Sequence, residues 1–226
     1  MSGAQPRPTV GARVGHALGK VLAHGVWNTT VLGAQHVPSD GPVLLAANHT
    51  GVIDGPVLVG ASPRPAHILI KEEMFAGPVG AVLRAVDQIP VDRDNPRAAL
   101  AAALDVLKRG EVVGIFPEGS RGRGDASDSR AGITWLALNG RAPVVPVAIL
   151  GTRRTGQGVN HLPRLRHRLV VAFGEPVVVE RAAGVPGRQA MAEANDRLRD
   201  ALALHVAATV TATGIPLPTD DPLSAG

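Results

Sequence analysis

The chain has 226 residues, a length typical of one domain that buries a substantial hydrophobic core. Aromatic residues make up only 2% and tyrosine is absent, so we expect no nucleic-acid partner that is bound by stacking on aromatic side chains. Cysteine is absent, which excludes disulfides and fits a reducing compartment. The net charge of +4 suits an anionic membrane surface or a phosphorylated substrate as well as nucleic acid, so charge alone does not choose the ligand.

The N-terminal residues 1–9 contain two prolines and no hydrophobic periodicity, which indicates a loose leader. They lack the apolar stretch and the cleavage pattern of a secretory signal peptide. No uninterrupted apolar run approaches the roughly 18 residues that a membrane-spanning helix needs. We therefore expect a protein of the cytoplasm without a membrane-spanning segment.

Hydrophobic residues recur at helical spacing between Val10 and Val31, which predicts an amphipathic helix that ends near Trp27 or shortly after it. The members of the apolar stripe are Val10, Val14, Leu18, Val21, Leu22 and Val26. Three glycines in this segment weaken an isolated helix, so a partner must stabilise it. The partner could be the core of the domain or a membrane interface, and the periodicity leaves both open.

After the turn signal 38-PSDGP-42, short apolar segments alternate with segments of helical character. Predicted strands cover residues 43–47, 66–70, 88–91, 111–116, 144–150 and 169–173. Predicted helices cover residues 55–59, 72–86 with a break at Gly77, 96–110 with Asn95 as its cap, 131–139 and 187–208. The alternation predicts an α/β domain, with a mostly parallel or mixed central sheet flanked by helices, after the N-terminal amphipathic segment. We expect the leader and amphipathic helix to occupy residues 1–34, the domain residues 35–212 and a disordered tail residues 213–226.

His49 and Asp54 stand five residues apart in the segment 45-LAANHTGVIDGPVL-58. On one continuous helix their side chains would point about 140° apart, so they meet only if His49 lies on a turn before the helix. A carboxylate bonded to one imidazole nitrogen would leave the other nitrogen as a base. The chain has no cysteine and no Gly-x-Ser-x-Gly elbow, so such a base would act on a hydroxyl or water of the substrate. A purely structural pair in a turn is the alternative.

A glycine- and arginine-rich loop, 116-FPEGSRGRG-124, follows another predicted strand. Its glycines would let backbone amides approach an anion, and Arg121 and Arg123 could hold phosphate oxygens. The loop has neither the ending of a Walker loop nor the glycine spacing of a Rossmann fold. A basic surface loop is the alternative, although it explains Glu118 poorly.

Three of these polar segments follow predicted strands, which is where ligands gather in open α/β sheets. They are residues 48–54, Asp92 with Arg93, and residues 117–123. Taken alone, Arg93 is better explained as a surface arginine paired with a neighbouring aspartate. The histidines form no cluster with the spacing of metal ligands, so we expect no metal.

Four segments, NHTGVID, IPVDR, FPEGSR and APVVPVAI, occur in this order and resemble the four sequence blocks of the glycerolipid acyltransferase family. The resemblance covers residues 35–180, roughly, and four blocks in order are far more specific than any one of them. It implies transfer of a fatty acyl group from acyl-CoA or acyl-carrier protein to the free hydroxyl of 1-acyl-sn-glycerol-3-phosphate, which gives phosphatidic acid in phospholipid biosynthesis.

The resemblance also implies roles for individual residues. His49 falls on the general base and Asp54 on its partner, while Arg93, Glu118, Gly119, Ser120 and Arg121 fall on residues that bind the phosphate and glycerol of the acceptor. Residues 145–147 fall on the block that shapes the acyl-donor side. No cofactor is implied beyond the acyl donor itself.

Because such an acceptor is a membrane lipid, the resemblance favours the membrane as partner of the N-terminal helix and a peripheral location on the cytoplasmic side. An acceptor of the same chemical kind, another lysophospholipid or a mannosylated phosphoinositide, is one alternative. A catalytically silent lipid-binding module and a hydrolase that uses water are the others.

Overall fold

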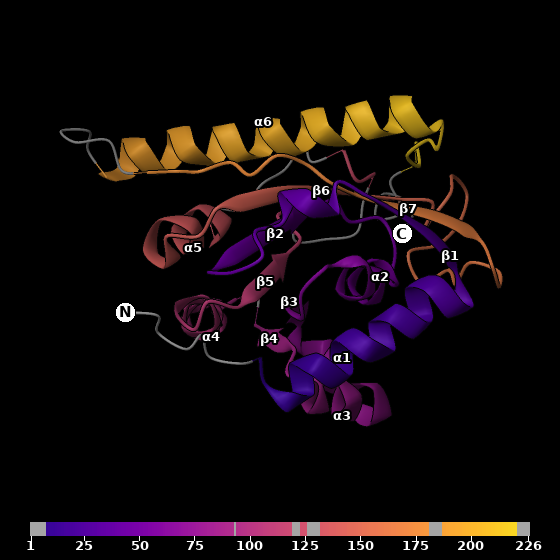
Figure 1. Ribbon diagram of the computed structural model, residues 1–226, viewed down its shortest axis with the longest axis horizontal. Coiled ribbons are helices and arrows are strands. Elements are labelled where there is room, and N and C mark those ends of the chain that lie inside the picture. Colours follow the sequence, from indigo (N-terminus) through magenta and orange to yellow (C-terminus); the bar gives the residue numbers. More distant parts are fainter. Residues whose placement is uncertain (1–7, 93, 119–122, 126–131, 181–186, 221–226) are drawn as a thin grey trace.

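The computed structural model describes residues 8–92, 94–118, 123–125, 132–180 and 187–220 (Figure 1). Within these residues, a seven-stranded sheet has the order β1-β7-β6-β2-β5-β3-β4. Neighbouring strands are parallel except for β6 and β7, which are antiparallel. The predicted α/β fold with a mixed central sheet is thereby confirmed. The strands are β1 (Asn28–Leu32), β2 (Val43–Ala47), β3 (Ala66–Lys71), β4 (Ile89–Val91), β5 (Val112–Ile115), β6 (Val144–Leu150) and β7 (Arg168–Phe173).

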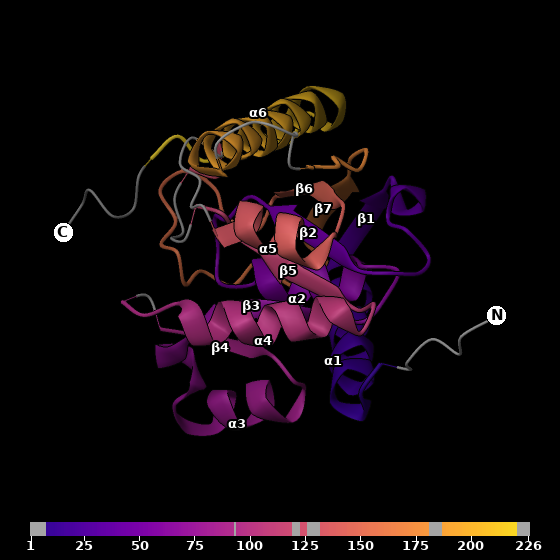
Figure 2. The ribbon, with the colours of Figure 1, turned by 90° about the vertical axis from the view of Figure 1, so that its left-hand side faces the viewer.

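Helices cover both faces of the sheet. They are α1 (Val10–Lys20), η1 (Val21–Val26), η2 (Ala34–His36), α2 (Asp54–Ala61), η3 (Glu72–Phe75), α3 (Gly77–Ala85), α4 (Arg97–Lys108), α5 (Gly132–Gly140) and α6 (Gly187–Thr213). Figure 1 shows α4 and α5 on one side of the sheet and α1 and α2 on the other, and Figure 2 looks onto the side of α4 and α5. The alternating residues Leu44 and Leu45 of β2 enter separate core clusters, one on each face, because successive side chains of a strand point in opposite directions.

The N-terminal helix is shorter than predicted. The α-helix α1 ends at Lys20, a π-helical turn η1 continues to Val26, and residues 28–32 form β1, which pairs in parallel with β7. The prediction of a helix up to Val31 was wrong because β-branched residues at 29–31 suit a strand and the partner strand lies about 140 residues further along the chain. Strand β1 of the central sheet thus lies before residue 35, where we expected the α/β domain to begin.

The packing face of α1 consists of three small residues and one histidine. Ala12, Gly15, His16 and Gly19 are buried, and the backbone of Gly19 lies against that of Gly60 in α2. Four of the six residues of the predicted apolar stripe point into solvent instead, namely Val10, Val14, Leu18 and Val21, which are exposed by 68%, 48%, 48% and 61%. The other two, Leu22 and Val26 in η1, pack against the core. Helix α1 therefore contacts the domain through its glycines and leaves its apolar stripe uncovered within the described part of the chain.

Most other predicted elements are confirmed to within two residues at each end. The break at Gly77 is real, since η3 and α3 meet there, but α4 begins at Arg97 with Pro96 as its cap, and Asn95 does not cap it. Helix α6 runs five residues further than predicted, to Thr213. Among the described residues, no helix is long and apolar enough to cross a membrane.

The C-terminal segment is ordered as far as Asp220, so the prediction of a disordered tail was wrong for residues 214–220. The guanidinium of Arg153, which is fully buried, donates hydrogen bonds to the Asp220 carboxylate at 3.1 Å and to its backbone oxygen at 3.0 Å. The hydroxyls of Thr155 and Thr219 lie 3.2 Å apart beside this pair. Residues 221–226 lie outside the described residues.

Candidate active site

The turn between β2 and α2 brings His49 and Asp54 together. Strand β2 ends at Ala47 and α2 begins at Asp54, so His49 lies on the turn, as the contact requires. The Nδ1 atom of His49 is 2.8 Å from Oδ2 of Asp54. The same oxygen accepts the backbone N–H groups of Thr50 at 2.7 Å and Gly51 at 2.8 Å. The turn is therefore folded around the carboxylate, which is fully buried.

The imidazole of His49 is held in one orientation. Because a carboxylate accepts at Nδ1, the Nδ1 atom carries the proton and Nε2 is the basic nitrogen. The ring of Phe116 stacks on the imidazole with a centroid distance of 4.1 Å and an angle of 19° between the planes. The His49 side chain keeps 15% of its surface exposed, and no hydrogen-bond partner of Nε2 is found among the described residues. A substrate hydroxyl can thus reach the basic nitrogen.

The β2–α2 turn, residues 48–54, is hydrogen-bonded to β6 and to the segment after it. The fully buried side-chain amide of Asn48 donates to the backbone oxygen of Ile149 at 3.1 Å, and its Oδ1 accepts the N–H of the same residue at 2.7 Å. The hydroxyls of Thr50 and Thr152 lie 2.9 Å apart. These bonds fix the turn relative to the sheet.

Sequence reasoning missed this structural role of Asn48 and the stacking of Phe116 on His49. A signal for Asn48 was present, because an amide at the end of a fully apolar strand needs a buried partner. No local signal pointed to Phe116, since its contact depends on the parallel pairing of β2 and β5.

The segment after β5 reaches the same turn. The carboxylate oxygen Oε1 of Glu118 accepts the backbone N–H of His49 at 3.3 Å. Further along, Gly124 has a left-handed φ of 72°, and a Cβ added there would meet Cγ2 of Thr50 at 2.4 Å. The loop between these two points therefore begins and ends beside His49.

The other predicted substrate-binding residues, Arg93, Gly119, Ser120 and Arg121, lie outside the described residues. Their roles, like the catalytic roles of His49 and Asp54, stay predictions. Within the described part of the chain, no group of three or more His, Asp or Glu side chains could hold a metal ion.

The arrangement has the chemistry of a general base with an orienting carboxylate. One oxygen of Asp54 holds the imidazole tautomer, and 15% of the His49 side chain remains exposed. A pair of this kind can activate a hydroxyl without forming a covalent bond itself, which suits direct transfer between two bound substrates.

Comparison with known proteins agrees with this geometry. A family model described as Acyltransferase matches residues 28–150, which include the whole β2–α2 turn. The chain is 33% identical over 177 residues to the 1-acyl-sn-glycerol-3-phosphate acyltransferase of Bacillus subtilis, covering 75% of this chain and 86% of that protein. It is 32% identical over 127 residues to the protein of the same name from Borreliella burgdorferi, covering 54% of this chain and 51% of that protein.

A solved structure supports the fold. The crystal structure of the 1-acyl-sn-glycerophosphate acyltransferase PlsC from Thermotoga maritima has a TM-score of 0.65 at 20% identity, covering 88% of this chain and 79% of that one. At this identity the likeness concerns the fold alone. Together with the family match over more than half of the chain, the comparisons confirm the resemblance read from the four sequence blocks, and the protein belongs to the acyltransferase family.

Proposed function

We propose that this acyltransferase moves a fatty acyl group from acyl-CoA or acyl-carrier protein to the free hydroxyl of 1-acyl-sn-glycerol-3-phosphate, which yields phosphatidic acid for phospholipid biosynthesis. The observation that carries the proposal is the 2.8 Å contact between Nδ1 of His49 and Oδ2 of Asp54, which leaves Nε2 as the basic nitrogen of a side chain that is 15% exposed. The names of the Bacillus and Borreliella relatives support the choice of acceptor.

In the proposed reaction, Nε2 of His49 takes the proton of the acceptor hydroxyl while its oxygen attacks the carbonyl carbon of the thioester. The imidazolium that forms is stabilised by Asp54 and returns the proton to the departing thiolate. A new ester bond forms and the thioester bond breaks. No covalent bond to the protein is needed, because both substrates are held side by side.

Acceptor binding is assigned to the two loops that follow β4 and β5. Arg93 and Arg121 would hold the phosphate, with Gly119 and Ser120 in the same loop as Arg121. The contact of Glu118 with the His49 N–H supports this, since it brings the start of that loop to the base. An Arg121→Ala variant is expected to raise the KM for the acceptor far more than the KM for the donor.

A peripheral location on the cytoplasmic side of the membrane fits the outward stripe of α1. Because α1 packs through its glycines, its exposed valine and leucine side chains are free to enter a lipid interface. Replacing both Val14 and Leu18 by serine should weaken binding to anionic vesicles. The matched control is Leu204→Ser, which changes a leucine exposed by 72% on α6, on the other side of the molecule (Figure 1).

The deciding experiment is an acyl-transfer assay of wild type and His49→Ala with 1-acyl-sn-glycerol-3-phosphate, other lysophospholipids and a mannosylated phosphoinositide as acceptors. Removal of the base is expected to lower kcat by about 10²–10⁴ with the true acceptor. His24→Ala, at an exposed position of η1, is the control. Undiminished transfer by a folded His49→Ala protein would overturn the mechanism, and preference for another lysophospholipid would change the acceptor.

A further inference from the structure

The loop between β6 and β7, residues 151–167, carries a concentration of positive charge that the proposed reaction does not use. It contains no aspartate or glutamate. Arg154, Arg164 and Arg166 are exposed, and Arg168 follows at the start of β7. None of these four arginines forms a salt bridge with another described residue.

Part of this charge surrounds a pocket of about 410 Å³. Its lining residues are Gly151, Arg154, Gln157, His161, Pro163, Arg164 and His167. Burial, and next the positive charge of Arg154, lowers the pKa of His167 below its ordinary value, so the two arginines supply the positive charge of the pocket near pH 7. A concave site with two arginines and no carboxylate in its lining is suited to an anion of phosphate type.

Two leucines flank the pocket and point into solvent. Leu162 follows a tight turn closed by the N–H of His161 and the oxygen of Gly158 at 2.9 Å, and it is exposed by 65%. Leu165 lies in the next turn, in which the N–H of His167 donates to the backbone oxygen of Arg164 at 3.1 Å. Its side chain is exposed by 73%. Large apolar side chains at the tips of turns beside a cationic pocket are typical of surfaces that meet a lipid interface.

The loop is attached to the N-terminal helical segment. The backbone N–H of Arg166 donates to the backbone oxygen of Val26 at 2.7 Å. The guanidinium of Arg166 donates to the backbone oxygen of His24 at 3.0 Å. Arg166 has a left-handed φ of 58°, which is unfavourable for an arginine and is maintained here by these bonds. The indole N–H of Trp27 donates to the backbone oxygen of Pro163 at 3.2 Å. Consequently the loop that carries the two exposed leucines lies against η1 and the residue that follows it.

We propose that the β6–β7 loop is a second membrane-docking element, in which Leu162 and Leu165 enter the lipid interface while Arg154 and Arg164 bind the phosphate of an anionic phospholipid headgroup. The proposal rests on the proposed function only in that a lipid acceptor brings the protein to a bilayer. The backbone oxygen of Val159 in this loop also accepts the N–H of Val52 in the β2–α2 turn, at 2.9 Å. Docking through this loop would therefore set the distance of His49 from the membrane surface.

The exposed side chains of Leu162 and Leu165 favour a lipid headgroup over the phosphates of the acyl donor as the ligand of the pocket. Phosphates of a water-soluble donor need cations but no exposed apolar side chains beside them. A headgroup in a bilayer has acyl chains immediately below it, which is what Leu162 and Leu165 would meet. The continuity of the loop with η1 and α1 favours the same assignment.

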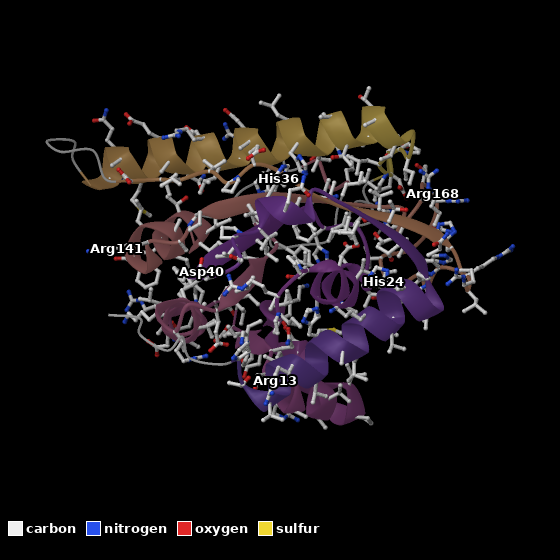
Figure 3. All side chains as sticks on the ribbon, viewed as in Figure 1. Arg13, His24, His36, Asp40, Arg141 and Arg168 are labelled. Carbon is white, nitrogen blue, oxygen red and sulfur yellow. The ribbon has the colours of Figure 1, made fainter. Side chains whose placement is uncertain are left out.

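The first test is co-sedimentation with phosphatidylcholine vesicles, with and without phosphatidylglycerol. The variant Arg154→Gln/Arg164→Gln is expected to lose affinity for the anionic vesicles, about fivefold for each arginine and thus about twenty-five-fold in total. The matched control Arg141→Gln/Arg188→Gln removes the same charge from exposed positions far from the loop and should keep wild-type affinity within about twofold. Arg141 and Arg168 lie at opposite ends of the molecule in Figure 3.

Each outcome decides the proposal. Equal loss in both double variants would overturn it in favour of net charge alone. Unchanged vesicle binding with a raised KM for the acyl donor would overturn it in favour of donor phosphates. An unchanged affinity for anionic vesicles together with an unchanged KM for the acyl donor would also overturn it.

A second test does not depend on the arginine variant folding. Because the chain has no cysteine, a single Leu165→Cys can carry an environment-sensitive fluorophore, with Arg141→Cys as control. The label at 165 is expected to shift to the blue on anionic vesicles and the label at 141 to stay unchanged; no shift at 165 would contradict docking through the loop. Vesicle binding and the fluorescence shift are measured without acyl transfer, so failure of docking and failure of the proposed reaction remain distinguishable.

Discussion

His49 is constrained at its backbone, at one ring nitrogen and on one ring face. Glu118 accepts its backbone N–H, Asp54 holds Nδ1, and Phe116 covers the ring. Each contact removes a way in which the imidazole could turn, so the basic nitrogen needs no reorganisation before it meets a hydroxyl. At the scale of single residues, orientation is therefore what separates this histidine from an ordinary surface histidine.

The Asp54→Asn variant keeps the size of the side chain at position 54 and removes the carboxylate that orients the imidazole of His49. An amide at this position can donate to Nδ1 and stabilise the wrong imidazole tautomer, so kcat is expected to fall by about 10²–10⁴ while the KM for the acceptor changes little. Steady-state kinetics with both substrates varied provides the measurement. A raised KM at wild-type kcat would assign Asp54 to binding instead.

His16 gives the stability of the protein a dependence on pH. Burial, with a smaller effect of Lys20, lowers the pKa of His16 below its ordinary value of 6.5, and its Nε2 atom is buried without a hydrogen-bond partner. The unfolded chain therefore binds a proton below pH 6.5 that the folded protein does not. The contribution is fully present above that pH and is lost as the pH falls from 6.5 through the folded pKa.

Replacing His16 by glutamine should flatten the decline of the free energy of unfolding as the pH falls below 6.5. Urea unfolding at a series of pH values measures this. His24→Gln, at an exposed position of η1, should keep the wild-type slope. The same slope in His16→Gln as in wild type would show that other groups are responsible.

The contact between α1 and α2 depends on glycine. A Cβ added to Gly60 would lie 2.1 Å from the backbone oxygen of Gly19, whereas nothing lies within 4 Å of a Cβ added to Gly55 in the same helix. Only the close approach of these two backbones lets α1 pack by its small residues and turn its apolar stripe outward. At the scale of elements, two glycines thus set which face of α1 is exposed.

Gly60→Ala and Gly55→Ala form a matched pair within α2. The first is expected to lower the free energy of unfolding by about 1–3 kcal/mol, because α1 must move away from α2. The second should raise it by about 0.5 kcal/mol, since alanine is the better helix former and meets no neighbour. Chemical denaturation distinguishes the two, and equal effects would contradict the close contact.

At the scale of the whole molecule, the C-terminal segment ties together the loops around the active site. Asp220 binds the buried Arg153 in the β6–β7 loop, and Leu217 lies close to Gly124 in the loop after β5. Both of these loops also contact the β2–α2 turn, through Thr152 and Gly124. The end of the chain therefore supports the site from outside.

Asp220→Ala should lower the melting temperature by several degrees, because it leaves the buried guanidinium of Arg153 without its carboxylate. Asp200→Ala is the matched control, since it removes a carboxylate 3.1 Å from Arg199 on the exposed face of α6. Pairs of that kind contribute little, so its melting temperature should stay near wild type. Scanning calorimetry measures both, and equal shifts would show that burial of Arg153 is unimportant.

The amino-acid sequence by itself determined the elements whose signals are local. The apolar runs of β2 and β6, the break at Gly77 and the four sequence blocks are readable without coordinates because pattern and turn chemistry act over a few residues. The resemblance drawn from those blocks was sufficient to find the family.

Tertiary structure alone decided what depends on distant partners. Residues 28–32 became a strand because β7 accepts their hydrogen bonds, and the tail became ordered because Arg153 needs a carboxylate. The stripe of α1 turned outward because Gly19 and Gly60 fit together. His49 met Asp54 because the buried carboxylate gathers the N–H groups of the turn, and in each case the stabilising group lies on a part of the chain that local periodicity does not report.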